Sequence, residues 1–142
     1  MGLKSAPMSE VFFSDCIVPE ANLIGKEGMG FPILDHVMKW EILCSFAINI
    51  GEMSHRLQRS IDYAKMRKQF GNPIGSYQAI SHKLANMKIN LETARLWLYY
   101  TGKKFQAKKN ISLELAITKI LTSESNVDSA LEAIQIFGGY GY

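Results

Sequence analysis

A helical repeat of apolar residues covers most of this chain, and it limits the folds that the chain can adopt. From Phe31 onward the spacing of apolar residues changes from about two to about 3.6 residues, which is typical of an α-helix. The pattern predicts a first helix from Phe31 to about Met66, with Pro32 in its first turn, where a missing N–H costs nothing. At a rise of 1.5 Å per residue this helix would be about 50 Å long, so it needs packing partners along its length. The residues that recur on one side of this helix are Ile33, Leu34, Val37, Met38, Glu41, Ile42, Ser45 and Phe46.

Two further amphipathic segments supply those partners. Gly102 is expected to weaken the second helix near its end, and Ser112 is the predicted N-cap of a third helix, which closes at Gly138 and Gly139. Apolar residues recur in both segments at helical spacing. The predicted buried stripe is Ile80, Leu84, Met87, Leu91, Ala94, Leu98 and Phe105 in the second helix, and Leu113, Ala116, Ile120, Val127, Leu131 and Ile134 in the third.

Three long helices with short connections fold as antiparallel neighbours, so the sequence predicts an all-α, up-down helical bundle. Their mixed faces indicate a fourth helix that is missing or supplied elsewhere. Residues 8–18 are instead rich in β-branched and aromatic residues and end at Pro19, which predicts a β-strand before the bundle. We therefore expect residues 1–29 to form a strand and a glycine-rich linker, and residues 30–142 to form a bundle truncated before its last helix.

Charge and cysteine content narrow the function classes. The net charge of +3 is spread along the 142 residues, and its tightest cluster, at 103–109, is typical of a solvated helix end. A nucleic-acid-binding bundle that uses Lys103, Lys104, Lys108 and Lys109 remains a rival interpretation, although we expect no such binding. Cys16 and Cys44 lack a paired spacing, which favours a reduced, cytoplasmic protein, and the three histidines have no metal-ligand spacing. Apolar runs fall short of the roughly 18 residues that a membrane span needs.

Two glycine-bearing polar loops interrupt the helical pattern where a simple bundle would need neither. The first is "MRKQFGNPIGSYQ" between the first two helices, and the second is "QIFGGYGY" after the third. Together with "VPEANLIGKEGMGF" before the first helix, they resemble the C-terminal half of the acyl-CoA dehydrogenase family of flavoproteins over the whole chain. The ordered set of motif residues carries the resemblance: Arg67, Phe70 and Gly71, then Gln78, and finally Gln135, Gly138, Gly139 and Gly141.

The resemblance implies that residues 1–29 end a middle β-domain and that the bundle builds a homodimer or homotetramer. In such enzymes these loops lie against the pyrophosphate and adenine of an FAD bound to a neighbouring subunit. A diphosphate needs fixed hydrogen-bond donors and close approach of the backbone. The resemblance accordingly assigns cofactor contacts to Arg67, Gln69, Gln78 and Gln135, to the backbone of Gly138 and Gly139, and to the rings of Phe70 and Tyr77. The alternative from the residues alone is that Arg67 and Lys68 cap a helix end and the glycines terminate helices.

The chemistry that the resemblance implies is removal of an α-proton and a β-hydride from an acyl thioester of coenzyme A or of an acyl carrier protein. Most family members carry the catalytic base beyond the point where this chain ends, but a minority place it where Glu41 stands. Two expected thioester contacts are replaced by Lys39 and Ile42, and the "MKWE" context resembles the branch linked to carrier proteins. An electron-accepting flavoprotein is a further implied partner, and the fragment alone should be inactive. A helical oligomerisation module that has lost its flavin is the alternative.

Overall fold

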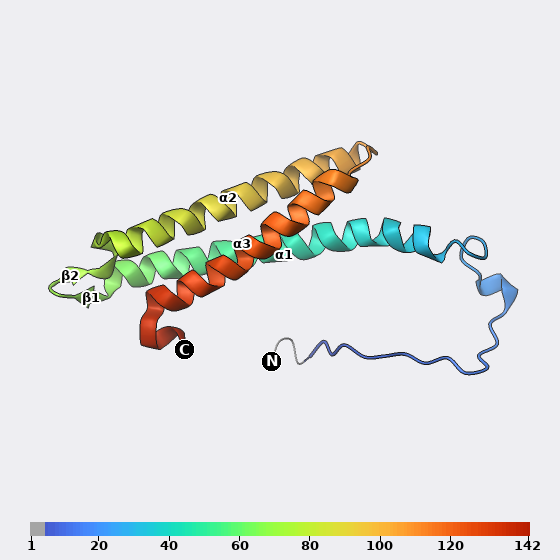
Figure 1. Cartoon of the computed structure of the whole chain (residues 1–142), viewed down its shortest axis with the longest axis horizontal. Coiled ribbons are helices and arrows are strands. Elements are labelled where there is room, and N and C mark those ends of the chain that lie inside the picture. The colour runs from blue at the N-terminus through green and yellow to red at the C-terminus, as the bar shows by residue number, and fades with distance from the viewer. Residues whose placement is uncertain (1–4) are drawn as a thin grey trace. The chain divides into compact units, whose positions relative to one another are not determined.

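The computed structural model describes residues 5–142, which divide into a unit that ends at Leu34 and a unit from Asp35 to Tyr142. Three long helices dominate the structure (Figure 1). A short hairpin, whose two strands have two residues each, joins the first helix to the second. The elements are η1 (Glu20–Asn22), α1 (Gly30–Met66), β1 (Lys68–Gln69), β2 (Asn72–Pro73), η2 (Ile74–Ser76), α2 (Gln78–Gln106), α3 (Ser112–Phe137) and η3 (Gly138–Gly141).

The strand predicted over residues 8–18 is wrong. Within the described residues this stretch has no regular structure and pairs with no strand, and its apolar side chains are exposed, with Ile17 at 94%. A strand exists through hydrogen bonds to a neighbouring strand, so β-branched and aromatic composition cannot form one without a partner. The proposed status of residues 1–29 as the end of a β-domain is a separate matter and stays a prediction.

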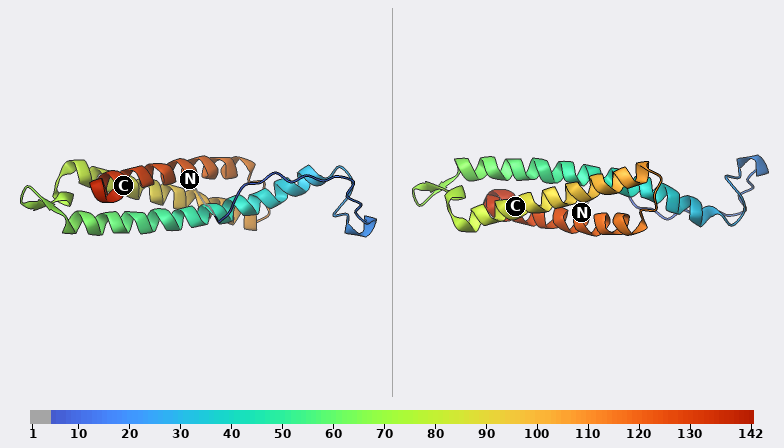
Figure 2. Two further views of the ribbon diagram at one scale, coloured as in Figure 1. Left: turned by 90° about the horizontal axis from the view of Figure 1, so that it is seen from below. Right: turned by 90° about the horizontal axis from the view of Figure 1, so that it is seen from above.

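The predicted all-α, up-down bundle is confirmed. Helices α1 and α2 run antiparallel, as do α2 and α3, and the views of Figure 2 show the three lying side by side. The expected first helix differs from α1 by one residue at its start, and α2 continues through Gly102. The predicted stripe of α2 is also correct, because its central members are buried and its outer members half-buried. The core contains Phe46, Ile50, Met53 and Leu57 of α1, Met87, Leu91, Ala94 and Leu98 of α2, and Ala133 and Ile136 of α3.

The stripe predicted for α3 is wrong. Its large members are exposed, including Ile120 at 56% and Leu131 at 60%, and the buried face of α3 instead carries Thr118, Thr122 and Ser129 together with Leu115, Ala133 and Ile136. Small side chains let two helices approach closely, and α2 and α3 are the helix pair with the closest backbones. Periodicity alone cannot distinguish an apolar face inside the chain from one that another chain or segment covers. The exposed face of α3 is therefore an apolar surface that no segment of residues 5–142 covers.

Hydrogen bonds satisfy part of the small polar seam between α2 and α3. The hydroxyl oxygens of Thr101 and Thr118 lie 2.8 Å apart, and Thr118 also donates to the carbonyl of Trp97 at 3.3 Å. Thr122 Oγ1 is buried and has no hydrogen-bond partner among residues 5–142. Such a group costs free energy, because burial removes its hydration without replacing it.

The start of α3 differs from the prediction. Ser112 is the first helical residue, not the N-cap, and it gives its backbone N–H and its hydroxyl to Asn110 Oδ1, at 3.0 and 2.9 Å. Asn110 therefore provides the side-chain acceptor that the sequence predicts at Ser112. Asparagine and serine both bond their own local backbone, so the two assignments are hard to separate from sequence.

Candidate functional site

A tight hairpin follows directly after α1 and sets the position of the first polar loop. Strands β1 and β2 pair with Lys68 opposite Pro73 and Gln69 opposite Asn72. Phe70 and Gly71 form the two-residue turn, with φ of 51° and 83°, as a primed hairpin turn requires. Phe70 is 92% exposed in a conformation that bulky residues avoid. The turn therefore holds an aromatic ring outward at a cost in backbone strain, which is a recurring feature of functional sites.

Glycine is required where α3 ends. Gly138 has φ 59° and ψ −130°, a conformation that residues with a Cβ avoid. At Gly141 an added Cβ would lie 2.6 Å from the carbonyl oxygen of Ile134. The chain therefore turns sharply at the end of α3 and packs η3 back against the last helical turn.

Aromatic contacts join the end of α1 to the end of α3. The rings of Tyr63 and Phe137 stack with centroids 4.4 Å apart and an interplanar angle of 21°. Tyr140 packs edge-on to Tyr63 at 6.4 Å, and the Arg59 guanidinium lies 5.9 Å from the Phe137 ring centre. The Tyr63 hydroxyl also donates a hydrogen bond to the Phe137 carbonyl. These contacts bring together two loops that are separated by about 70 residues in the sequence.

A cleft of about 710 Å³ opens between the two loops, and we call it the terminal cleft. Its volume lies within the range of about 300–1,000 Å³ that is usual for small-molecule sites. It contains no acidic side chain, and its single charged group is Arg67. The lining residues are Tyr63, Arg67, Gln69, Phe70, Ile74, Tyr77, Ile80, Ile136, Phe137, Gly138, Gly139 and Tyr140.

The polar groups of the terminal cleft fit a phosphate-bearing ligand. Within the described part of the chain, the Arg67 guanidinium has no hydrogen bond or ion pair, so its donors are available to an anion. Tyr77 donates its hydroxyl proton to the Gln69 carbonyl at 2.9 Å, which orients the ring against the hairpin. The Gly138 N–H already donates to carbonyls of α3, so it is not free to bind a ligand. The unpaired guanidinium of Arg67 could contact a phosphate group, and the aromatic rings around it could pack against the rest of a nucleotide.

The structure brings together six of the eight predicted cofactor residues: Arg67, Gln69, Phe70, Tyr77, Gly138 and Gly139 all line the terminal cleft. Gln78 and Gln135 are exposed and do not line it, although Gln135 lies one turn before Gly138 at the same end of the bundle. Sequence reasoning missed Tyr63, Phe137 and Tyr140. Tyr63 could have been found, because it lies four residues before Arg67 and so on the same side of the helix end.

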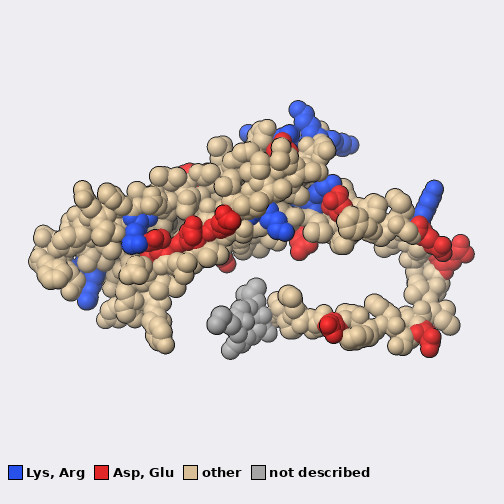
Figure 3. Space-filling model, in the orientation of Figure 1, with Lys and Arg blue, Asp and Glu red and all other residues tan. Residues whose placement is uncertain are grey.

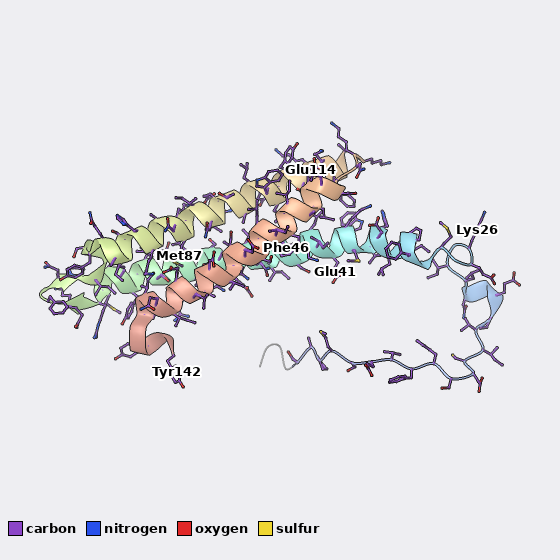
Figure 4. The ribbon with its side chains drawn as sticks, viewed as in Figure 1. Lys26, Glu41, Phe46, Met87, Glu114 and Tyr142 are labelled. Carbon is purple, nitrogen blue, oxygen red and sulfur yellow. The ribbon has the colours of Figure 1, made fainter. Side chains whose placement is uncertain are left out.

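Glu41, the candidate base, lies far from the terminal cleft. It is exposed on α1, and 25 residues separate it from Met66, so the two positions are about 38 Å apart along the helix. Figure 4 shows Glu41 well away from Tyr142, which lies beside the cleft end of the bundle. Glu41 makes no hydrogen bond or ion pair with any described residue. Within one chain, therefore, the terminal cleft and Glu41 cannot act on the same atoms.

The described residues thus form a helical bundle with a cleft at one end in which Arg67 lies among aromatic rings. The sequence model described as "Acyl-CoA dehydrogenase, C-terminal domain" matches residues 28–142. The chain therefore belongs to the acyl-CoA dehydrogenase family and represents its C-terminal domain.

Curated relatives agree with this assignment. The chain is 43% identical over 139 residues to an L-prolyl-[peptidyl-carrier protein] dehydrogenase of Pseudomonas fluorescens, covering 98% of this chain and 37% of that protein. It is 37% identical over all 142 residues to a short-chain-specific acyl-CoA dehydrogenase of Megasphaera elsdenii, again covering 37% of that protein. The chain thus spans a little over a third of the length of these relatives.

Solved structures show the same fold. The structure titled "PigA with FAD and proline" superposes with a TM-score of 0.89 at 38% identity, covering 91% of this chain and 34% of that one. The prolyl acyl carrier protein oxidase AnaB gives a TM-score of 0.88 at 41% identity with the same coverage. Butyryl-CoA dehydrogenase of Megasphaera elsdenii gives 0.84 at 38% identity, covering 88% and 33%. In the described residues, no helix is long and apolar enough to cross a membrane.

Proposed function

We propose that this chain is the C-terminal part of an FAD-dependent dehydrogenase that oxidises an acyl group held as a thioester on a carrier protein. The observation that carries the proposal is the terminal cleft, in which a strained hairpin and a glycine turn, both family motifs, surround the free guanidinium of Arg67. The names of two curated relatives, both L-prolyl-[peptidyl-carrier protein] dehydrogenases, support a carrier-bound prolyl group as the substrate. A coenzyme A thioester is the alternative carrier, as in the Megasphaera elsdenii relative.

The residues of the terminal cleft would hold the FAD pyrophosphate and the adjoining part of the dinucleotide. Arg67 supplies a planar fork of donors for the phosphate oxygens. Phe70 and Tyr77 supply flat apolar surface, and Gly139 permits close approach of the backbone. Gln78 and Gln135 would contact the dinucleotide only if their exposed side chains turned toward it. When bound, FAD supplies the acceptor for the hydride that leaves the β-carbon.

We assign the removal of the α-proton to Glu41. Its carboxylate has no partner within the described chain and is therefore available as a base. Because Glu41 lies about 38 Å from the end of α1, its substrate and the dinucleotide held by the terminal cleft belong to different active sites. This separation supports an assembly in which each protomer completes the flavin site of a neighbour.

The exposed apolar face of α3 supports such an assembly. Ile120, Val127, Leu131 and Ile134 are each at least half exposed and follow one another at helical spacing. A contiguous apolar face of this kind is typical of a surface that another subunit or segment covers. We propose that the complete protein is a homotetramer, with a homodimer as the alternative, located in the cytoplasm, where the free thiols of Cys16 and Cys44 stay reduced. An electron-transfer flavoprotein would reoxidise the cofactor.

The experiment is a chimera in which these 142 residues replace the matching segment of the Pseudomonas fluorescens relative. We expect purified chimera to retain FAD and to oxidise a prolyl thioester. Arg67→Ala should weaken FAD retention about tenfold or more, because a charge-assisted contact is lost. The matched control Lys65→Ala removes an exposed cation two residues earlier and should leave FAD content unchanged.

The base is tested in the same chimera. Glu41→Gln should lower turnover by about 10²–10⁴-fold with FAD content unchanged, because only proton transfer is affected. Glu124→Gln alters an exposed glutamate of α3 and should retain full turnover. A chimera that folds but holds no FAD would favour the alternative of a non-catalytic oligomerisation module. Arg67→Ala with normal FAD content would instead show that Arg67 does not hold the cofactor.

A further inference from the structure

The turn between α2 and α3 gathers basic side chains that the proposed function has not used. Residues 103–109 contain four lysines and no acidic residue. Figure 3 shows Lys and Arg side chains clustered where α2 meets α3. We call Lys103, Lys104, Lys108 and Lys109 the lysine turn.

Most of this charge is uncompensated. Lys104 pairs with Glu114, which raises the pKa of Lys104 through their hydrogen bond. Lys103, Lys108 and Lys109 are exposed and form no ion pair with any residue from 5 to 142. The turn therefore presents three free ammonium groups to solvent.

The backbone of the lysine turn keeps a lysine where glycine would be more stable. The N–H of Lys109 donates to the Lys104 carbonyl at 3.1 Å and the N–H of Lys108 donates to the Phe105 carbonyl at 2.9 Å. This pair of bonds is the Schellman motif, in which the residue at the Lys108 position is left-handed and is usually glycine. Lys108 has a φ of 53° and so is strained. Retaining lysine there is unfavourable for the helix end, which is consistent with a use for its charge.

The lysine turn lies beside the part of α1 that carries the proposed base. A second cleft, of about 930 Å³, is lined by Lys39 and Trp40 of α1 together with Lys108 and Lys109. The rings of Trp40 and Phe105 meet edge-on at 4.8 Å and tie the two elements together. Trp40 immediately precedes Glu41. The positive surface is therefore at the Glu41 end of the bundle, not at the end with the terminal cleft.

We propose that the lysine turn is a docking surface for the acidic face of the carrier domain that delivers the thioester; this inference rests on the proposed function. A tethered acyl group can reach Glu41 only if its carrier protein docks within the length of the phosphopantetheine arm. Three free cations on one turn complement a carboxylate-rich surface and accelerate its association. The pattern thus fits a protein partner that docks near the base.

The test is binding of the 142-residue chain to a phosphopantetheinylated, negatively charged peptidyl carrier domain, measured by fluorescence anisotropy. Lys108→Ala/Lys109→Ala should raise Kd about tenfold at low salt, and raising the salt concentration should reduce this difference. The matched control Lys65→Ala/Lys88→Ala removes the same charge from exposed lysines elsewhere and should change Kd less than twofold.

Lys108→Gly separates docking from structure. Relief of the left-handed strain should raise Tm by about 3 °C, while loss of the charge should raise Kd about threefold. A purely structural lysine would not weaken binding when the protein becomes more stable. A higher Tm with unchanged Kd would therefore overturn the proposal.

Competition identifies the ligand class. Free coenzyme A and duplex DNA should displace the carrier domain only at concentrations far above its Kd. Displacement by coenzyme A at or below that Kd would make the lysine turn a coenzyme A site, and displacement by DNA would make it a nucleic-acid site; either result contradicts carrier docking.

If the chimera oxidises the thioester but both double variants bind the carrier domain equally well, the docking surface is wrong and the proposed function stands. If the lysine turn binds the carrier domain but the chimera is inactive, the proposed function fails and carrier binding remains.

Discussion

Tyr63 and Phe137 stack face to face, with ring centroids 4.4 Å apart, and this contact joins the last turns of α1 and α3. The Tyr63 hydroxyl also donates to the Phe137 carbonyl at 3.4 Å. Both residues line the terminal cleft, so the contact that joins the two helix ends also forms part of the cleft wall. Stability and ligand binding are therefore linked at this position.

A double-mutant cycle measures that link. Tyr63→Leu and Phe137→Leu should each lower the free energy of unfolding, and together they should lose about 1 kcal/mol less than the sum, because the stacked pair is lost only once. Urea unfolding of the 142-residue chain gives all four values. Tyr140→Ala, at an exposed ring of the same cleft, should change stability by no more than about 0.5 kcal/mol. Strict additivity of the two leucine variants would show that the rings do not interact.

The Thr122 hydroxyl has no hydrogen-bond partner among the described residues, whereas the Thr118 hydroxyl has two, so the same substitution should change stability in opposite directions at the two positions. Thr122→Val removes a buried polar group that has no hydrogen bond and should stabilise the chain by about 1 kcal/mol. Thr118→Val makes the same chemical change about one helical turn away, but it breaks the bonds to Thr101 and Trp97 and should destabilise by a similar amount. The midpoints of urea unfolding decide the signs. Equal shifts in the same direction would contradict the assigned hydrogen bonds.

The ion pair between Lys104 and Glu114 makes stability depend on pH. The hydrogen bond from Lys104 lowers the pKa of Glu114 below the ordinary value of 4.5 and raises the pKa of Lys104 above 10.5. The Glu114 contribution is therefore complete above pH 4.5 and is lost as the pH falls through the lower, folded-state pKa. The Lys104 contribution is complete below pH 10.5 and is lost as the pH rises through its higher, folded-state pKa.

Glu114→Gln tests this dependence. The stability difference between the parent and the variant should be constant near neutral pH and should shrink only at the acidic and alkaline extremes. Urea unfolding across the pH range measures it, and Glu124→Gln, at an exposed glutamate of the same helix, should show no such profile. A difference that varies between pH 6 and 8 would contradict the pairing, because neither group titrates there.

The exposed face of α3 predicts self-association. Ile120→Glu/Leu131→Glu places charge in the apolar stripe and should shift the chain from oligomer to monomer in analytical ultracentrifugation, with the helical circular dichroism signal retained. Lys119→Glu is the control, because it makes the same change in charge on α3 outside the stripe and should leave the oligomer intact. A monomeric parent chain at all concentrations would show that a different segment covers this face.

Several features of this protein follow from local sequence. The bounds of the helices and the stripe of α2 are predictable because apolar spacing and loop residues act over one or two turns. The two loops could be recognised because polar residues and glycines, such as Gly71 and Gly138, interrupt the helical pattern. The order of these motifs along the chain also indicated the family.

Only the tertiary structure decided which faces are buried and which residues meet. Sequence placed the large apolar residues of α3 inside, whereas the fold leaves them exposed and buries Thr118, Thr122 and Ser129. Small side chains permit close helix packing, and Thr118 meets Thr101 and Trp97 of α2. The predicted strand at 8–18 failed for a related reason, since a strand needs hydrogen bonds from a neighbour that composition cannot supply. Spacing likewise could not reveal that Tyr63 meets Phe137 or that Glu41 lies at the other end of the bundle. Local patterns fix local geometry, but contacts between residues far apart in sequence are fixed by how whole helices pack.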